Sequence, residues 1–219
     1  MLKPIGRAHR WLDEIKKLGG RLGGAAMKRY QIIYADPPWK YNVFSDKPPC
    51  ARKAEEAYYE VADLIDLVRL PVKEIAGDNC VLFMWATYPA LPIALKLLKE
   101  WGFHYRTVAF TWVKKNKKSN SWFWGMGGWT RANAEICLLA TRGNPKRASK
   151  SVHSVIDAPI REHSQKPDEI RERIVELMGN VPRIELFARR KVEGWDCWGN
   201  GVESDIKLTE IKGIEENDR

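Results

Sequence analysis

The sequence is most informative at Tyr30–Trp39, which reads YQIIYADPPW. Its first six residues, Tyr30–Ala35, are apolar, aromatic or β-branched apart from one glutamine, a pattern typical of a strand buried on both faces. A polar turn stiffened by two prolines, Asp36–Trp39, follows at once. In open parallel α/β sheets, ligands bind beyond the carboxyl ends of the strands. The stretch therefore predicts a buried strand with a candidate site at its end.

Beyond Trp39, short apolar runs alternate with helical patterns. The runs that predict further strands are Cys80–Ala86, Thr107–Val113, Glu135–Ala140, Val152–Ile156 and Arg183–Phe187. The helical patterns are Val61–Leu70, Pro89–Trp101 and Pro167–Met178, the last ended by Gly179. This alternation predicts an α/β fold with a mostly parallel sheet and helices on both faces. Two long loops, Lys40–Ala57 and Lys114–Thr130, interrupt it.

Length and composition restrict the class of protein. The chain has 219 residues, 44% of them apolar, which suits one large domain with a sizeable core and excludes wholesale disorder. The longest apolar run, Cys80–Ala86, is far too short for a membrane span, and residues 1–17 contain no signal-peptide core. The four cysteines show no metal-ligand spacing, so we expect no metal site and a reducing, cytoplasmic location.

Charge is unevenly distributed along the chain. The formal net charge is +9, and residues 106–150 hold ten Lys or Arg against one acid, Glu135. A basic stretch often forms only a solvated face, but here it is interleaved with tryptophans, as a nucleic-acid groove requires. We expect a basic extension at 1–29, one domain at 30–203 and an acidic tail at 204–219. The lysines expected to contact nucleic acid are Lys114, Lys115, Lys117 and Lys118.

The Asp-Pro-Pro-Trp turn has a composition suited to one kind of chemistry. An exocyclic amino group on a base is a poor nucleophile, because its lone pair is delocalised into the ring. A carboxylate such as Asp36 can accept one amino N–H, while a backbone carbonyl such as that of Pro37 accepts the other; Pro38 stiffens the loop. Trp39 could stack on the base, which must leave its helix to be reached. The electrophile would be a sulfonium methyl group.

With this turn, the sequence resembles the adenine-N6 methyltransferases typified by the catalytic subunit of the eukaryotic messenger-RNA adenosine methyltransferase, in their compact prokaryotic or phage form. The resemblance extends from about residue 30 to residue 203. It includes Val81–Thr87, Trp112–Lys114, Gly128–Arg131 with Asn133 and Glu135, Arg142–Pro145, Arg161–Glu169, Glu185–Arg189, Gly194–Trp195 and Trp198–Asn200. It implies a Rossmann-like S-adenosylmethionine-dependent fold with a permuted motif order, in which the catalytic loop comes early and most cofactor contacts come late.

The resemblance also implies roles for individual residues. The catalytic residues would be Asp36, Pro37, Pro38 and Trp39. Asp36 would also lie near the amino group of S-adenosylmethionine, and Lys166 would pair with the cofactor's carboxylate. Arg189 and Asn200 would bind its ribose or adenine end. The remaining cofactor residues would be Phe187 and Glu185, the latter orienting Arg189.

On the nucleic-acid side, the resemblance implies that Trp39 and Tyr58 form the base pocket. It also places Trp129, Arg131 and Asn133 near the active site. Glu135 has a second interpretation, a structural ion pair, with Arg131 as its candidate partner.

Other functions remain open at this point. Cys50 follows two prolines, as a cytosine-C5 methyltransferase nucleophile does, but no apolar strand precedes it, so we treat it as incidental. Cytosine-N4 enzymes usually have Ser where this chain has Asp36. Within the resembled family, the alternatives are an RNA adenosine N6-methyltransferase and a catalytically silent nucleic-acid-binding partner. The Asp-Pro-Pro-Trp loop together with Lys166, Arg189 and Asn200 favours an active subunit. The small size and the resemblance to prokaryotic and phage members favour DNA over RNA.

Overall fold

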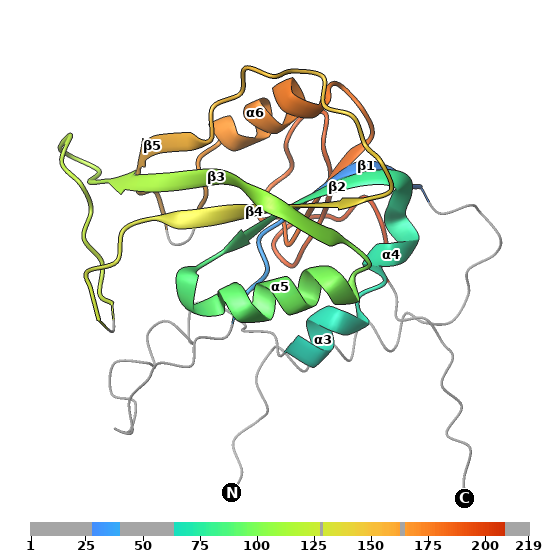
Figure 1. Cartoon of the computed structure of the whole chain (residues 1–219), viewed down its shortest axis with the longest axis horizontal. Helices are drawn as coiled ribbons and strands as arrows, with labels where there is room; N and C mark the ends of the chain where they lie inside the picture. Colours follow the sequence, from blue (N-terminus) through green and yellow to red (C-terminus); the bar gives the residue numbers. More distant parts are fainter. Residues whose placement is uncertain (1–27, 40–63, 128, 163–164, 209–219) are drawn as a thin grey trace, which may run out of the picture.

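The computed structural model describes residues 28–39, 64–127, 129–162 and 165–208, which build one seven-stranded sheet with helices on both faces (Figure 1). The strands are β1 (Tyr30–Ala35), β2 (Ala76–Ala86), β3 (His104–Lys115), β4 (Glu135–Arg142), β5 (Val155–Pro159), β6 (Arg183–Leu186) and β7 (Asp196–Trp198). The helices are α3 (Leu64–Arg69), α4 (Val72–Ile75), a 3₁₀ turn (Tyr88–Ala90), α5 (Leu91–Glu100) and α6 (Glu169–Met178).

The order of strands across the sheet is β5-β3-β4-β2-β1-β6-β7. Among the described strands, β4 alone runs antiparallel to its neighbours, β2 and β3, while the other pairings are parallel. β1 pairs with β2 along one edge and with β6 along the other, so it is a central strand of the sheet. The predicted Rossmann-like α/β fold with a mostly parallel sheet is confirmed.

Alternate residues of the central strands supply two separate cores, as the two-residue period of a strand requires. From β1, Ile33 and Ala35 face the core beneath α3 and α5, whereas Ile32 and Tyr34 face the core beneath α6. Figure 1 shows α5 and α6 on opposite sides of the sheet. Burying each large apolar side chain contributes about 1.5–3 kcal/mol, which explains why the strand sequences lack alternation with polar residues.

The ends of α6 follow from local chemistry. The amide of Ile170 donates to the carbonyl of Pro167, so the first turn is built on that proline. Gly179 ends the helix with φ at +86°, a conformation that a side chain would strain. The predicted range Pro167–Met178 therefore matches closely. Two elements, α4 and β7, were not predicted.

The chain between β3 and β4 forms an arm, which we define as residues 116–127 and 129–134. It projects beyond the end of the sheet at which β3 finishes, and Figure 1 shows it as the yellow-green excursion. Because β3 and β4 are antiparallel, His104 pairs with Thr141 at the far end and Trp112 pairs with Glu135 near the arm. No described helix is long and apolar enough to cross a membrane.

Candidate active site

Asp36 and Lys166 form the centre of the candidate site. Asp36 is the first residue after β1, and Lys166 lies just before α6, 130 positions further along the chain. The Lys166 ammonium donates to both carboxylate oxygens of Asp36, at 2.9 and 2.8 Å. The side chain of Lys166 is 9% exposed and that of Asp36 is 24% exposed. Two residues predicted separately for catalysis and cofactor binding are thus in direct contact.

Glu135 extends this pair into a row of alternating charges. Its carboxylate lies 3.3 Å from the Lys166 ammonium and 2.5 Å from that of Lys114. Glu135 begins β4 and Lys114 lies near the end of β3, next to the arm. The prediction that Glu135 forms a structural ion pair with Arg131 was wrong in its partner, because the two lysines hold the carboxylate instead.

Burial and these neighbours together set the protonation of the row. Burial and the nearby Glu135 raise the pKa of Asp36 above its ordinary value, although Lys166 opposes the shift. Burial would also raise the pKa of Glu135, but Lys166 and Lys114 outweigh it and lower that pKa. Burial disfavours the Lys166 ammonium, yet the two carboxylates raise its pKa well above the usual range. Lys166 is therefore a fixed positive charge.

Trp39 is anchored rather than exposed. It is buried, and its indole N–H donates to the carbonyl of Trp85 at the end of β2, at 2.9 Å. The backbone amide of Trp39 donates to the Pro37 carbonyl, also at 2.9 Å, which closes the turn. A carbonyl oxygen has two lone pairs, so Pro37 keeps one for a further donor. Tyr58, the other residue predicted for the base pocket, lies outside the described residues, as does Cys50.

The carboxyl ends of β6 and β7 lie against each other beside β1. The Ala188 amide donates to the Trp198 carbonyl, and the Phe187 ring packs on the edge of Trp198. Gly199 must be glycine here, since a Cβ would lie 2.1 Å from the Ala188 carbonyl oxygen. Phe187 has φ at +62°, an unfavourable conformation for a large side chain that often occurs at functional sites.

This junction brings two predicted cofactor residues together. A Cβ on Gly201 would lie 3.7 Å from the Arg189 carbonyl oxygen, so the segment that contains Asn200 passes beside Arg189. Both segments follow strands parallel to β1, on the same edge of the sheet as Asp36. The sequence placed these residues 11 positions apart, and the pairing of β6 with β7 makes them neighbours.

Glu185 binds a partner that the sequence did not predict. Its carboxylate accepts two hydrogen bonds from the Arg171 guanidinium, each 2.7 Å, in a two-pronged ion pair. Arg171 also contacts Asp168, and its guanidinium lies 5.5 Å from the centre of the Tyr34 ring. The expected orienting partner of Glu185 was Arg189, but the ion pair described here orients Arg171. Its use in cofactor binding stays a prediction.

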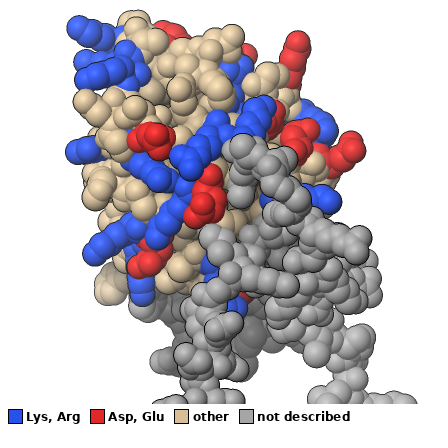
Figure 2. Space-filling model, turned by 90° about the vertical axis from the view of Figure 1, so that its right-hand side faces the viewer, with Lys and Arg blue, Asp and Glu red and all other residues tan. Residues whose placement is uncertain are grey.

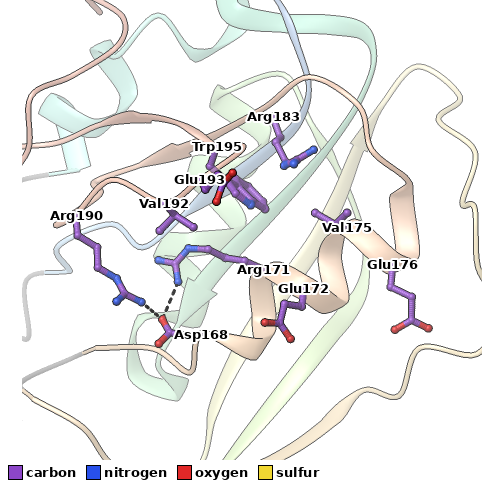
Figure 3. A pocket seen from close by; sticks show the side chains of 10 residues that line it. All are labelled: Asp168, Arg171, Glu172, Val175, Glu176, Arg183, Arg190, Val192, Glu193 and Trp195. Carbon is purple, nitrogen blue, oxygen red and sulfur yellow. Dashed lines mark hydrogen bonds and ion pairs between the residues drawn. The ribbon is translucent and has the colours of Figure 1, made fainter.

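A hollow of about 600 Å³ lies between α6 and the segment that connects β6 to β7 (Figure 3). Its lining residues are Asp168, Arg171, Glu172, Val175, Glu176, Arg183, Arg190, Val192, Glu193 and Trp195. In the close-up, Arg171 and Arg190 both point toward Asp168, so the charges compensate one another. None of the described residues predicted for the site lines this hollow, which is distinct from the Asp36–Lys166 pair.

The four predicted nucleic-acid lysines divide into two pairs. Lys114 is held by Glu135, and Lys115 lies 2.6 Å from Asp157 on β5, so both charges have partners within the protein. Lys117 and Lys118 are exposed at the start of the arm. Trp129 and Arg131 are exposed as well. Asn133 instead uses its side chain inside the arm, with three hydrogen bonds to the backbone of Lys114 and Phe123.

These observations define an α/β enzyme of the Rossmann-like class, with a buried carboxylate–ammonium pair at the carboxyl edge of a parallel sheet. Comparison with known proteins places it more narrowly. The model of the MT-A70 family matches residues 30–201, and the chain belongs to that family. It is therefore a methyltransferase, as the sequence predicted.

The chain matches one relative over most of that relative's length and others over only a small part of theirs. It is 32% identical to the Type II methyltransferase M.MunI from Mycoplasma sp. over 206 residues, covering 87% of this chain and 85% of the relative. It is 31% identical over 179 residues to the human N(6)-adenosine-methyltransferase catalytic subunit METTL3, covering 80% of this chain but 28% of the relative. An Arabidopsis thaliana N(6)-adenosine-methyltransferase MT-A70-like protein is 30% identical, and 23% of its length is covered. The chain thus spans about a quarter of the human and plant relatives.

Proposed function

We propose that the protein transfers a methyl group from S-adenosylmethionine to the N6 amino group of adenine in DNA. The observation that carries this proposal is the Asp36 carboxylate, fixed at the end of β1 by the Lys166 ammonium at 2.8 Å. Membership of the MT-A70 family and the named activities of the relatives support the same reaction.

The chain's own residues would prepare the target nitrogen. The Asp36 carboxylate accepts one amino N–H, and the remaining lone pair of the Pro37 carbonyl accepts the other. Withdrawal of both hydrogens out of the base plane favours a tetrahedral, nucleophilic nitrogen. Asp36 must be ionised for this role, and the adjacent Lys166 ammonium favours ionisation. No strong general base is required, because the transferred methyl group makes the amino proton acidic.

The residues at the edge of the sheet suit S-adenosylmethionine by their donor chemistry. When bound, the cofactor supplies an electrophilic methyl group on a sulfonium. The Lys166 ammonium matches its carboxylate, while Arg189 and Asn200, side by side beyond β6 and β7, match its ribose and adenine. Asp36 lies close enough to Lys166 to meet the cofactor's ammonium group as well. Phe187, at its unusual φ, and Glu185 complete the proposed pocket.

DNA is the favoured substrate because the chain covers 85% of a Type II methyltransferase, a class that acts on DNA, but 28% of the human adenosine methyltransferase. Transfer to RNA is the second candidate, supported by the 31% identity to that enzyme. The deciding measurement is transfer of a radiolabelled methyl group to DNA and RNA oligonucleotides of matched sequence. The labelled nucleoside is then identified.

In this assay, we expect Asp36→Ala to abolish transfer, because the target amino group loses its carboxylate acceptor. Asp36→Asn should be severely impaired, although its amide oxygen still accepts a hydrogen bond. The matched control is Asp78→Ala, which removes an exposed carboxylate paired with Arg29 near the opposite end of the sheet. Near-normal turnover by Asp36→Ala would overturn the mechanism.

A further inference from the structure

The arm between β3 and β4 carries a concentration of exposed apolar side chains. Trp122 is 46% exposed, Trp124 61%, Met126 90% and Trp129 100%. The other tryptophans that the structure describes are buried, among them Trp85, Trp101 and Trp112. Apolar side chains gathered on one exposed segment mark an interaction surface.

The exposure of these side chains is built into the arm. An isolated bridge between Gly125 and Ala132 joins its two limbs, and another between Trp122 and Lys115, the last residue of β3, closes a turn at its start. Asn133 ties the base through its three side-chain hydrogen bonds. Toward the tip, Gly127 allows a close backbone approach, since a Cβ there would lie 1.9 Å from the Thr130 carbonyl oxygen. The arm therefore has a defined shape that holds its aromatic side chains outward.

Charge identifies the kind of partner. Residues 116–134 contain three Lys or Arg, namely Lys117, Lys118 and Arg131, and no Asp or Glu. All three basic residues are exposed. Exposed cations beside exposed aromatic rings match a phosphate backbone and its stacked bases. A purely apolar protein partner would not require the cations.

The arm also adjoins the catalytic row. Its last residue precedes Glu135, which contacts Lys166, which contacts Asp36. The Asp36 carboxylate is largely enclosed, so an adenine within a duplex cannot present its amino group there without leaving the base stack. Extrusion of a base leaves a gap that an aromatic side chain can fill.

We propose that the arm is a wedge: Trp129, flanked by Trp124 and Met126, enters the base stack and fills the space left by the extruded adenine. Lys117, Lys118 and Arg131 hold the adjacent phosphates. This inference rests on the proposed function, because it takes DNA as the substrate, and it adds how the duplex is opened.

The test uses the full-length protein with S-adenosylhomocysteine and two fluorescein-labelled duplexes of one sequence. One duplex is intact, and the other has a single central abasic site. A gap already present spares the cost of unstacking a base, so the wild-type protein should bind the abasic duplex about tenfold more tightly. Fluorescence anisotropy gives both affinities, and no methyl transfer is required.

Trp129→Ala should lose most of this preference, and Trp124→Ala should lose part of it. Both side chains are exposed, so thermal melting should not change. Tyr105→Ala is the matched control, since Tyr105 is an exposed aromatic on β3 near the end remote from the arm, and it should keep the full preference.

Three results would overturn the wedge: no preference in the wild-type protein, an undiminished preference in Trp129→Ala, or a change in sedimentation of Trp129→Ala that assigns the arm to contact between protein copies. A wild-type preference for the abasic duplex without any methyl transfer to DNA would count against the proposed function alone.

Discussion

At the residue scale, the unusual feature is an ammonium group shared by two carboxylates in a largely enclosed site. Lys166 contacts Asp36 and Glu135, and Glu135 is compensated in turn by Lys114. An unpaired buried charge would be costly, so each member of the row depends on its neighbours. Glu135 shares Lys166 with Asp36, and its negative charge opposes the effect of that ammonium on the pKa of the catalytic carboxylate. We therefore regard Glu135 as a positioning residue.

This role predicts the direction in which the pH dependence of activity should shift when Glu135 is replaced. Glu135 raises the pKa of Asp36, and Lys166 lowers it. In Glu135→Gln, Asp36 loses a negatively charged neighbour, and it no longer shares the Lys166 ammonium with a second carboxylate. Both changes lower the pKa of Asp36. Activity requires the Asp36 carboxylate and is lost as the pH falls through its pKa. The acid limb of kcat/KM should therefore move to lower pH, while the plateau falls about tenfold.

The measurement is the pH profile of methyl transfer. Asp157→Asn serves as the control, because Asp157 is an exposed carboxylate whose partner, Lys115, does not belong to the row. A purely structural role for Glu135 would lower activity without moving the acid limb, and that outcome would refute the positioning role.

A second prediction at this scale concerns the cofactor. Lys166→Ala and Asn200→Ala should weaken S-adenosylmethionine binding about tenfold or more, since a hydrogen bond to a charged group contributes roughly 1.5–3 kcal/mol. Calorimetry with the cofactor measures this directly. DNA binding, measured by anisotropy, should change less. Unchanged cofactor affinity in both variants would show that the pocket lies elsewhere.

The residue scale also shows what the sequence could not predict. Asp36 could be identified from the turn that follows a recognisable strand, and Lys166 from the resemblance to the adenine-N6 methyltransferases. Their contact could not, since it joins positions 130 apart and depends on α6 packing over β1. The Arg171–Glu185 ion pair was missed for the same reason: an arginine on a helix has no local signal that distinguishes a buried partner from solvent.

At the scale of elements, the strands were predictable where burial on both faces made long apolar runs. β1 matches its prediction at both ends. β7 was missed because its three residues, Asp196–Trp198, are too few to show a period. β5 was predicted three residues too early, since its register is set by the pairing of Val155 with Thr111 on β3. No pattern within the segment itself contains that information.

At the scale of elements, we predict that the side chain of Asn133 maintains the shape of the arm. Asn133→Ala removes three hydrogen bonds that join the base of the arm to Lys114 and Phe123. We expect faster amide hydrogen exchange across residues 114–133 and weaker DNA binding, with little change in the thermal melt, because the arm lies outside both cores.

The matched control is Asn116→Ala. Asn116 also makes side-chain hydrogen bonds within the arm, to Ser121 and Trp122, but they join residues close in sequence. Exchange in this variant should rise only around residues 116–122. If Asn133→Ala left exchange at the base of the arm unchanged, the shape of the arm would not depend on Asn133.

At the scale of the whole molecule, the fold divides a charge cluster that is continuous in the sequence. The antiparallel pairing of β3 and β4 leaves Lys117, Lys118 and Arg131 in the arm and carries Arg106 and Arg142 to the other end of the sheet. There Arg142 donates to the carbonyl of Lys73, and Arg106 donates to the hydroxyl of Thr141. Figure 2 shows the molecule from the right-hand side of Figure 1, where Lys and Arg are interspersed with Asp and Glu.

This division predicts that DNA contacts depend on position and not on net charge. Lys117 and Lys118 lie in the arm, whereas Lys146 and Arg147 follow β4 and are equally exposed. Replacing either pair by alanine lowers the formal net charge from +9 to +7. If the arm binds phosphates, Lys117→Ala with Lys118→Ala should weaken binding across all sequences. It should reduce the slope of log affinity against log salt by about 2, roughly 0.9 for each lost phosphate contact.

The Lys146→Ala and Arg147→Ala double variant is the matched control, and its slope should stay close to that of the wild-type protein. A general attraction between a basic protein and DNA would instead reduce both slopes equally, because the long-range field depends on the same net charge in each variant. Anisotropy of a labelled duplex across a salt series distinguishes these cases. Equal slopes in the two variants would assign the basic residues of the arm to solvated surface, whereas a loss confined to the arm variant would locate the DNA at the edge of the sheet that holds Asp36.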